Sequence, residues 1–259
     1  MLYDSSMASR VQPDPRSALR TCDSLAAARD RLIVALDVPG AEEAKELVDH
    51  LEGTCRWFKV GLELFIAAGP GIVETLTSRG CSVFLDLKLH DIPNTVAGAV
   101  RSAASLGAQM LTVHASGGPA MLSAARNALE GISNPPELLA VTVLTSMDAA
   151  QLRAVGLDRS APDQVTLLAR MGRDAGIRGF VCSPLEVAAL RALTGPEGVL
   201  VIPGIRPAEA AIGDQKRTAT PAEALRQGAS YLVVGRPITQ AADPARAADA
   251  ILREMALKA

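Results

Sequence analysis

The chain has 259 residues and a formal net charge of −2, and 49% of its residues are hydrophobic but only 3% aromatic. That length accommodates one large α/β barrel or two ordinary domains, and the composition predicts an aliphatic core. The near-neutral charge gives no reason to expect nucleic acid or an anionic membrane as a partner. No apolar run reaches the roughly 20 residues that span a bilayer, and the N-terminus has no apolar signal-peptide core. A soluble, cytoplasmic protein is therefore expected.

The first 28 residues differ in character from the rest of the chain. Residues 1–16 are polar and contain Pro13 and Pro15, which favours a disordered leader. Residues 17–29 are rich in Ala and Leu and predict a short helix outside the main fold. We therefore expect residues 1–28 to form a leader, partly disordered or helical, and residues 29–259 to form one catalytic domain.

From residue 29 onward, short apolar runs alternate with segments of helical spacing. The runs are apolar along their whole length, which is typical of parallel strands covered on both faces. Strands are predicted at residues 32–36, 57–60, 81–89, 110–114, 138–144, 179–182, 199–202 and 231–234. Helices are predicted at residues 41–51, 61–79 with a break near Gly69, 94–106 with Asn94 as N-cap, 119–129, 163–175, 184–193, near Pro221 and at 244–255.

This alternation predicts the α/β class and a single (β/α)8 TIM barrel, with the active site at the C-terminal ends of the strands. A doubly wound open sheet is the main alternative. Such sheets usually carry a glycine fingerprint after an early strand, and none follows the first or second strand here.

The predicted third strand ends in a group of charges. Asp86 and Lys88 are two residues apart, so on a strand their side chains point to the same face, and Asp91 follows where the strand should end. Ionised groups are rarely placed on a buried strand face unless they are paired. From this spacing alone, a structural ion pair and a catalytic cluster are both possible.

Charged or hydrogen-bonding groups also stand at the ends of most other predicted strands, namely Asp37, Lys59, His114, Thr145, Ser146, Arg206, Gly235 and Arg236. Because a barrel gathers these strand ends in one place, the pattern favours a catalytic site over scattered ion pairs. His114 by itself is more often a structural residue than an acid–base group, and His90 alternates away from Asp86 and Lys88 in strand phase.

The loops after the seventh and eighth strands predict a phosphate site. Such loops commonly bind phosphate in these barrels. Here they contain Pro203-Gly204-Ile205-Arg206 and Gly235-Arg236, and glycine lets backbone N–H groups approach an anion while arginine binds phosphate through two hydrogen bonds. Solvated surface arginines are the alternative. The long segment 207–218 is polar in its second half and contains a glycine, which predicts a lid.

A metal site is not indicated. None of the cysteines forms a C-x-x-C pair, and the histidines lack metal-ligand spacing. Free and mostly buried thiols are expected for these cysteines, which are Cys22, Cys55, Cys81 and Cys182.

The stretch Asp86-Leu87-Lys88-Leu89-His90-Asp91-Ile92-Pro93-Asn94-Thr95-Val96 resembles the signature of the orotidine 5′-phosphate decarboxylases in their bacterial form. A wider suprafamily of sugar-phosphate enzymes shares the D-x-K-x-x-D core, but the combination with D-I-P-N-T-V and G-D-Q-K-R is more specific. The resemblance continues at Leu36-Asp37, Phe58-Lys59-Val60-Gly61, Leu144-Thr145-Ser146, Pro203-Gly204-Ile205-Arg206, Gly213-Asp214-Gln215-Lys216-Arg217 and Val234-Gly235-Arg236.

The resemblance implies a homodimer that converts orotidine 5′-monophosphate to UMP and CO2 without a cofactor or metal. It implies that Lys59, Asp86, Lys88 and Asp91 form an alternating charged network, in which Lys88 gives the proton to pyrimidine C6. Asp91 and Thr95 would reach across the dimer interface.

The same resemblance implies the substrate contacts. The ribose hydroxyls would meet Asp37 and Lys59, and the pyrimidine would lie near Thr145 and Ser146. The remaining ligand shell, including the phosphate site, would comprise Ile92, Pro203, Arg206, Gln215, Gly235 and Arg236.

Two other functions remain open at this stage. A metal-dependent sugar-phosphate decarboxylase or synthase of the same suprafamily would stabilise an enediolate, although the G-D-Q-K-R segment favours a nucleotide substrate. A catalytically silent barrel that acts as a binding or scaffold protein is the other, and the complete set of charges at the strand ends argues against it.

Overall fold

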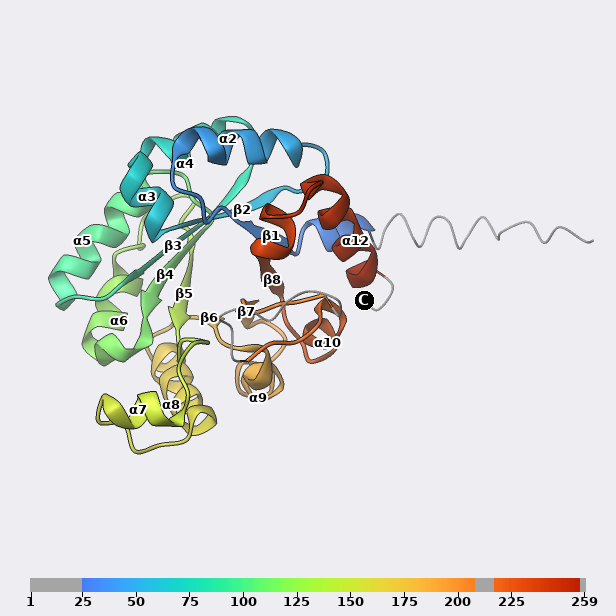
Figure 1. Cartoon of the computed structure of the whole chain (residues 1–259). Coiled ribbons are helices and arrows are strands. Elements are labelled where there is room, and N and C mark those ends of the chain that lie inside the picture. The colour runs from blue at the N-terminus through green and yellow to red at the C-terminus, as the bar shows by residue number, and fades with distance from the viewer. Residues whose placement is uncertain (1–24, 208–216, 257–259) are drawn as a thin grey trace, which may run out of the picture.

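The structure is a computed structural model that describes residues 25–207 and 217–256. Its strands are all parallel and close into a barrel in chain order, with β1 paired to β8 (Figure 1). The predicted (β/α)8 barrel is therefore confirmed, and the alternative of an open sheet is excluded. The strands are β1 (Leu32–Ala35), β2 (Trp57–Gly61), β3 (Ser82–Leu89), β4 (Met110–His114), β5 (Glu137–Val141), β6 (Gly179–Val181), β7 (Val199–Ile202) and β8 (Tyr231–Val234).

Helices surround the barrel and cover its outer face (Figure 1). They are α2 (Ala41–His50), α3 (Leu62–Ala68), α4 (Gly71–Ser78), α5 (Pro93–Ala104), α6 (Gly118–Asn127), α7 (Ala149–Ala154), α8 (Ala161–Asp174), α9 (Val187–Thr194), α10 (Pro221–Arg226), α11 (Arg236–Thr239) and α12 (Pro244–Ala256), with short 3-10 turns η1 (Ala115–Gly117) and η2 (Pro184–Glu186). The predicted break between α3 and α4 is confirmed at Gly69, whose φ of 68° favours glycine.

The core has two parts. A large aliphatic cluster fills the space between the strands and the helices. A smaller cluster fills the inside of the barrel, and the edge of Trp57 packs against Tyr231 below it with ring centroids 5.3 Å apart. The inner cluster consists of Ile33, Ala35, Phe84, Met110, Leu139, Val201 and Val233. Because side chains fill the barrel interior, space for a ligand is left at the ends of the strands.

Several details of the secondary structure differ from the prediction, among them the unpredicted short helix α11. The fifth strand stops at Val141 rather than at residue 144, and Val141 lies opposite the last residues of β4 and β6, which are His114 and Val181. Asn94 is not the N-cap of α5; Ile92 holds that position and Pro93 begins the helix, where its missing N–H costs no hydrogen bond. The helix α7 was not predicted, although Asp148 and Gln151 form a capping box at its start.

Two predicted segments lie largely outside the described residues. Of the leader, residues 25–28 are helical, and residues 1–24 are not described. Of the predicted lid, residues 208–216 are not described. Within the described ranges, no helix is long and apolar enough to cross a membrane.

Candidate active site

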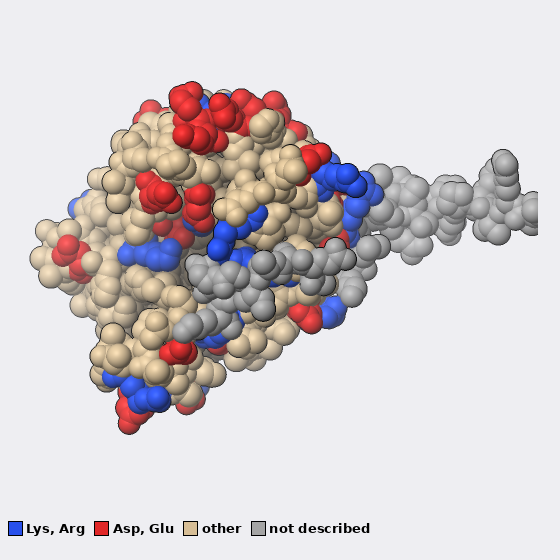
Figure 2. Space-filling view, in the orientation of Figure 1, with Lys and Arg blue, Asp and Glu red and all other residues tan. Residues whose placement is uncertain are grey.

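A pocket of about 390 Å³ opens at the C-terminal ends of the strands. Both basic and acidic side chains gather near the middle of the face shown in Figure 2. Ala35 of β1 and Val233 of β8 both line it, so strands from opposite ends of the barrel sequence meet here. The pocket is lined by Ala35, Asp37, Lys59, Phe84, Asp86, Lys88, Val141, Val143, Leu144, Thr145, Val181, Cys182, Pro203, Gly204, Arg206, Val233, Gly235, Arg236, Thr239 and Gln240.

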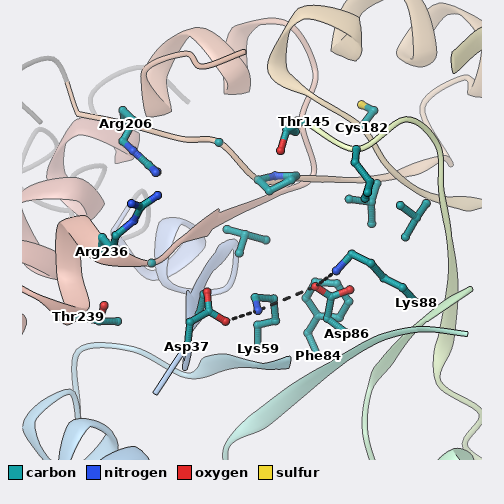
Figure 3. A pocket seen from close by; sticks show the side chains of 18 of the residues that line it. Asp37, Lys59, Phe84, Asp86, Lys88, Thr145, Cys182, Arg206, Arg236 and Thr239 are labelled. Carbon is teal, nitrogen blue, oxygen red and sulfur yellow. Dashed lines mark hydrogen bonds and ion pairs between the residues drawn. The ribbon is translucent and has the colours of Figure 1, made fainter. Parts of the chain in front are cut away.

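Four charged side chains alternate in sign along one wall of this pocket (Figure 3). The Nζ atom of Lys59 lies 2.7 Å from Oδ1 of Asp37 and 3.9 Å from Oδ2 of Asp86. The same Oδ2 atom lies 2.7 Å from Nζ of Lys88. The side chains of Lys59 and Asp86 are each only 11% exposed, so their charges are shielded from water and interact strongly.

An irregularity in β3 gives Lys88 its position. Leu85 pairs with Leu111 of β4, but Leu89 pairs with Val113, so four steps along β3 match two steps along β4. The extra residues form a bulge, which re-aims the side chains that follow it. Lys88 has a φ of 50°, the one non-glycine residue of the described chain with a positive φ. The bulge therefore turns its ammonium group back toward Asp86.

Two guanidinium groups stand at the other end of the pocket. Arg206 follows β7 and Arg236 follows β8, and Figure 3 shows them on the far side of Asp37 from Lys88. Partial burial lowers the pKa of Arg206, and the positive charge of Arg236 lowers it further. An anion between two such groups would relieve this repulsion and accept several charge-assisted hydrogen bonds.

The structure brings together most of the residues that the sequence singled out. Asp37, Lys59, Asp86, Lys88, Thr145, Pro203, Arg206, Gly235 and Arg236 all line the pocket. Four others do not line it and are exposed in the single chain, namely Asp91, Ile92, Thr95 and Ser146. Gln215 lies outside the described residues.

The turn after β3 carries Asp91 away from the Asp86–Lys88 pair. Its Oδ1 atom accepts a hydrogen bond from the backbone N–H of Ile92 at 2.6 Å, and no ion pair of Asp91 is found in the described part of the chain. Within one chain, the predicted network therefore contains Lys59, Asp86 and Lys88 but not Asp91.

The two histidines near this turn pack against each other. The ring centroids of His90 and His114 are 5.5 Å apart, and Nδ1 of His114 is buried without a hydrogen-bond partner among the described residues. Burial lowers the pKa of His114, and the nearby His90 and Lys88 lower it further, against an opposing effect of Asp86. His114 therefore favours its neutral form.

The sequence analysis did not predict two buried polar interactions next to the pocket. Thr112 of β4 donates a hydrogen bond to Asp86 at 3.0 Å and is fully buried. Arg217 forms a buried ion pair with Glu186 at 2.5 Å and donates to the backbone oxygen of Leu144 at 2.9 Å. The strand period could have identified Thr112, since it lies two residues after the inward-facing Met110. No local pattern joins Glu186 to Arg217.

The cysteines in the described part of the chain agree with the prediction of free thiols, and Cys22 lies outside it. Cys182 lines the pocket and is fully buried, which raises the pKa of its thiol. Cys55 and Cys81 are half-buried at the opposite end of the barrel, and burial raises the pKa of Cys55 to about 12. Such thiols are poor nucleophiles and poor metal ligands at neutral pH. In residues 25–207 and 217–256, no group of three or more His, Cys, Asp or Glu side chains could hold a metal ion.

Comparison with known proteins gives consistent results. Residues 30–251 match the family model described as "Orotidine 5'-phosphate decarboxylase / HUMPS family". The orotidine 5′-phosphate decarboxylase of Moorella thermoacetica is 54% identical over 234 residues, which cover 88% of this chain and 93% of that protein. Its counterpart from Anaeromyxobacter sp. (strain K) is 55% identical over 222 residues, covering 86% and 96%.

The fold agrees with the sequence comparison. The crystal structure of orotidine 5′-phosphate decarboxylase from Lactobacillus acidophilus is similar with a TM-score of 0.76 at 41% identity, and the match covers 87% of this chain and 98% of that one. The family match spans the whole barrel, including every strand that lines the pocket. The chain therefore belongs to the orotidine 5′-phosphate decarboxylase family of enzymes.

Proposed function

We propose that this enzyme decarboxylates orotidine 5′-monophosphate to UMP and CO2 in de novo pyrimidine biosynthesis, without a cofactor or metal. One observation carries the proposal: the order of chemical groups along the pocket. Figure 3 shows Lys88 and Asp86 at one end, Asp37 and Lys59 in the middle, and the two arginines at the other end. A nucleotide presents its base, its ribose and its phosphate in the same order.

The phosphate end would be held by charge. Arg206 and Arg236 would donate hydrogen bonds to the phosphate oxygens, and the absence of a side chain at Gly235 would let its backbone N–H approach. Gln215 is assigned to the same group by the family resemblance. In the middle of the pocket, Asp37 would accept from the ribose hydroxyls and Lys59 would donate to them, because their 2.7 Å ion pair places an acceptor beside a donor.

The pyrimidine would occupy the end near Lys88. Thr145 lines this part of the pocket with Pro203, and the exposed Ser146 follows Thr145. The apolar wall formed by Phe84 and Val233 lies beneath, at the top of the inner core cluster. A flat base fits an apolar surface with hydrogen-bonding groups at its edge.

In the proposed reaction, the bond between pyrimidine C6 and the carboxylate carbon breaks, its electron pair stays on C6, and CO2 leaves. Lys88 donates a proton from Nζ to C6, which gives UMP, and the resulting neutral amine takes up a proton from water. The C6 carbanion has no adjacent carbonyl that could delocalise it as an enolate. The enzyme must therefore stabilise it through preorganised charge, and the ammonium of Lys88 is the cation in reach.

Asp86 would act in two ways. It is the ion-pair partner of Lys88 at 2.7 Å, so it holds the ammonium group over the pocket. It would also repel the carboxylate of the bound substrate, and this repulsion would disappear as CO2 departs. Such destabilisation of the bound substrate is released in the transition state.

A homodimer would complete the site with Asp91 and Thr95 from the partner chain. Both residues are exposed in the single chain, where Asp91 accepts a hydrogen bond from the backbone N–H of Ile92 and forms no ion pair with another described residue. Large apolar side chains are also exposed on this segment and on α3, the helix that follows the preceding strand: Ile92 is 66% exposed, and Leu62 and Ile66 of α3 are 50% and 79% exposed. An apolar surface of this kind beside the site is suited to burial against a second copy.

The test is a spectrophotometric assay of orotidine 5′-monophosphate consumption by the purified protein, with and without a chelator such as EDTA. Turnover that is unaffected by the chelator is expected. Activity that the chelator abolishes and a divalent metal restores would instead support a metal-dependent sugar-phosphate enzyme of the suprafamily. A folded protein without turnover would contradict the proposal.

A further inference from the structure

Thr112 lies on β4, opposite the bulge in β3. Its neighbours Leu111 and Val113 pair with Leu85 and Leu89, so Thr112 faces the extra residues that the regular pairing skips. Its side chain points to the inside of the barrel, as that of Met110 does two positions earlier, and it is fully buried. A bulge leaves backbone groups of the longer strand without partners in the other strand.

The hydroxyl group of Thr112 makes two hydrogen bonds whose directions are determined by chemistry. The backbone N–H of Lys88 donates to Oγ1 of Thr112 at 2.8 Å, and an amide nitrogen can only donate. The single hydroxyl proton is therefore available for Oδ1 of Asp86, which lies 3.0 Å away. The hydroxyl accepts from one residue of the charged pair and donates to the other.

Together with the bond between Asp86 and Lys88, these two hydrogen bonds form a closed ring. Oδ2 of Asp86 accepts from Nζ of Lys88 at 2.7 Å, so each oxygen of the carboxylate has its own donor. Lys88 is in turn held at its backbone by Thr112 and at its side-chain nitrogen by Asp86. The left-handed backbone of Lys88, with φ at 50°, is unfavourable for a side-chain-bearing residue and persists only when its surroundings enforce it.

We propose that Thr112 is a positioning residue of the decarboxylation site, which sets the places of Asp86 and Lys88 through one buried hydroxyl group. Thr112 is not among the residues that line the pocket, so it acts through those two side chains and not on the substrate. Its effect on turnover rests on the proposed function, whereas its hold on the Lys88 backbone does not.

The first measurement compares kcat and KM for orotidine 5′-monophosphate in two variants. Thr112→Val keeps the shape of the side chain and removes both hydrogen bonds, and we expect kcat to fall roughly 10- to 100-fold, since small misplacements of reacting groups have costs of this size. The KM should change less than about threefold, because the phosphate and ribose contacts are untouched. Thr112→Ser restores the hydroxyl and should keep kcat within about threefold of the wild type.

Thr142→Val is the matched control. Thr142 is also a buried threonine, 3% exposed, and its hydroxyl donates to the backbone oxygen of Val181 at 2.9 Å. It does not line the pocket and makes no bond to the charged pair. Its substitution should leave kcat and KM unchanged. Thermal unfolding of every variant checks that the folds are comparable. If Thr112→Val does not fold, Thr112→Ala is compared with Thr112→Ser, because these two variants differ by the hydroxyl group alone.

The second measurement needs no substrate. Hydrogen exchange of the Lys88 backbone amide in the ligand-free protein should be at least about tenfold faster in Thr112→Val than in the wild type, and close to wild type in Thr112→Ser and Thr142→Val. If the wild type has no decarboxylase activity, the proposed function fails, and the exchange result still decides whether Thr112 holds Lys88.

Three results would overturn the proposal. The first is a folded Thr112→Val variant with near-normal kcat. The second is a Thr112→Ser variant that loses as much kcat as Thr112→Val, since the hydroxyl would then not be the group that matters. The third is unchanged exchange of the Lys88 amide in Thr112→Val.

Discussion

The side-chain nitrogen of Lys88 lies 2.7 Å from Oδ2 of Asp86, although the two residues are separated by a single leucine in the same strand. On a regular strand, side chains two positions apart point the same way and run parallel. Here the bulge in β3 and the positive φ of Lys88 bend the backbone, so that the ammonium group turns back onto the carboxylate. The pair is therefore a feature of the backbone as much as of the two side chains.

Replacing Lys88 by alanine should abolish turnover. The variant loses the proton donor and the cation that stabilises the carbanion, and we expect kcat to fall at least about 1,000-fold. The fold should persist, because the side chain of Lys88 is 30% exposed at the rim of the pocket. The assay is decarboxylation by the folded variant, checked by circular dichroism. Lys45→Ala, which removes an exposed lysine paired with Glu42 on α2, serves as the control. Near-normal kcat in Lys88→Ala would disprove the role of proton donor.

Replacing Arg236 by alanine should lower kcat/KM for the nucleotide substrate and leave kcat/KM for the nucleoside nearly unchanged. Arg236 lines the end of the pocket assigned to the phosphate, and a charge-assisted hydrogen bond to phosphate contributes roughly 1.5–3 kcal/mol. The kcat/KM for orotidine 5′-monophosphate should therefore fall roughly 10- to 100-fold. The kcat/KM for orotidine, which lacks the phosphate, should stay within about threefold of the wild type. Equal losses for both compounds would rule out a phosphate-specific role.

A mixture of two inactive variants should regain activity if Asp91 serves the partner's site. In a heterodimer of Asp91→Ala and Lys88→Ala, one site carries both lesions and the other is wild type. Random re-pairing of equal amounts yields about half heterodimers, each with one good site of two, so about a quarter of wild-type activity is expected. The measurement is turnover after subunit exchange, verified by mass spectrometry of tagged chains. Exchange without any recovery would mean that Asp91 acts within its own chain, or not at all.

Replacing Arg217 by alanine should destabilise the protein. Arg217 and Glu186 are 10% and 4% exposed at the side chain, and removing one partner of a buried pair leaves an uncompensated charge, which costs roughly 3–5 kcal/mol. Arg217 also donates to the backbone oxygen of Leu144 beside the pocket, so that loop loses a contact as well. Urea unfolding at neutral pH measures the difference.

The control for this effect is Arg253→Ala on α12. Arg253 pairs with Asp249 at 2.7 Å, but both side chains are well exposed at 66% and 40%. An exposed pair contributes about 0–1 kcal/mol, so this variant should unfold at nearly the wild-type urea concentration. Equal effects of the two substitutions would show that burial of the Arg217–Glu186 pair has no energetic consequence.

The neutral form of His114 should make stability depend on pH. Burial, His90 and Lys88 lower its pKa below the ordinary 6.5, so the unfolded chain binds the proton more readily than the folded one. The stabilising contribution of neutral His114 to the free energy of unfolding is fully present above pH 6.5. It is lost as pH falls through the lower pKa of the folded state. Urea midpoints between about pH 7.5 and about pH 5 should fall less steeply for His114→Gln than for the wild type. Parallel slopes would contradict this assignment.

Much of this molecule could be predicted from short-range patterns. The uniformly apolar strands, such as residues 199–202 and 231–234, required helices on their outer face, and the strand–helix alternation then led to a closed barrel. The charged ends of those strands meet in a barrel by topology, which is why Asp37, Lys59 and Arg206 were expected to line one pocket. These inferences depend on neighbours in sequence and on a fold with a single common face for its strand ends.

The remaining features depend on contacts between distant parts of the chain. The bulge that turns Lys88 toward Asp86 is a mismatch of register between β3 and β4, and register is set by packing of the whole barrel. Thr112 became part of the site only because that mismatch placed it opposite the bulge.

The buried pair of Glu186 and Arg217 joins positions 31 residues apart, with no spacing that would predict it. The sequence by itself determined which kinds of side chain stand at the strand ends, because a strand's apolar pattern and its charged end are both local. Only the tertiary structure decided which of them touch, because buried polar groups must find partners wherever the fold brings a donor to an acceptor.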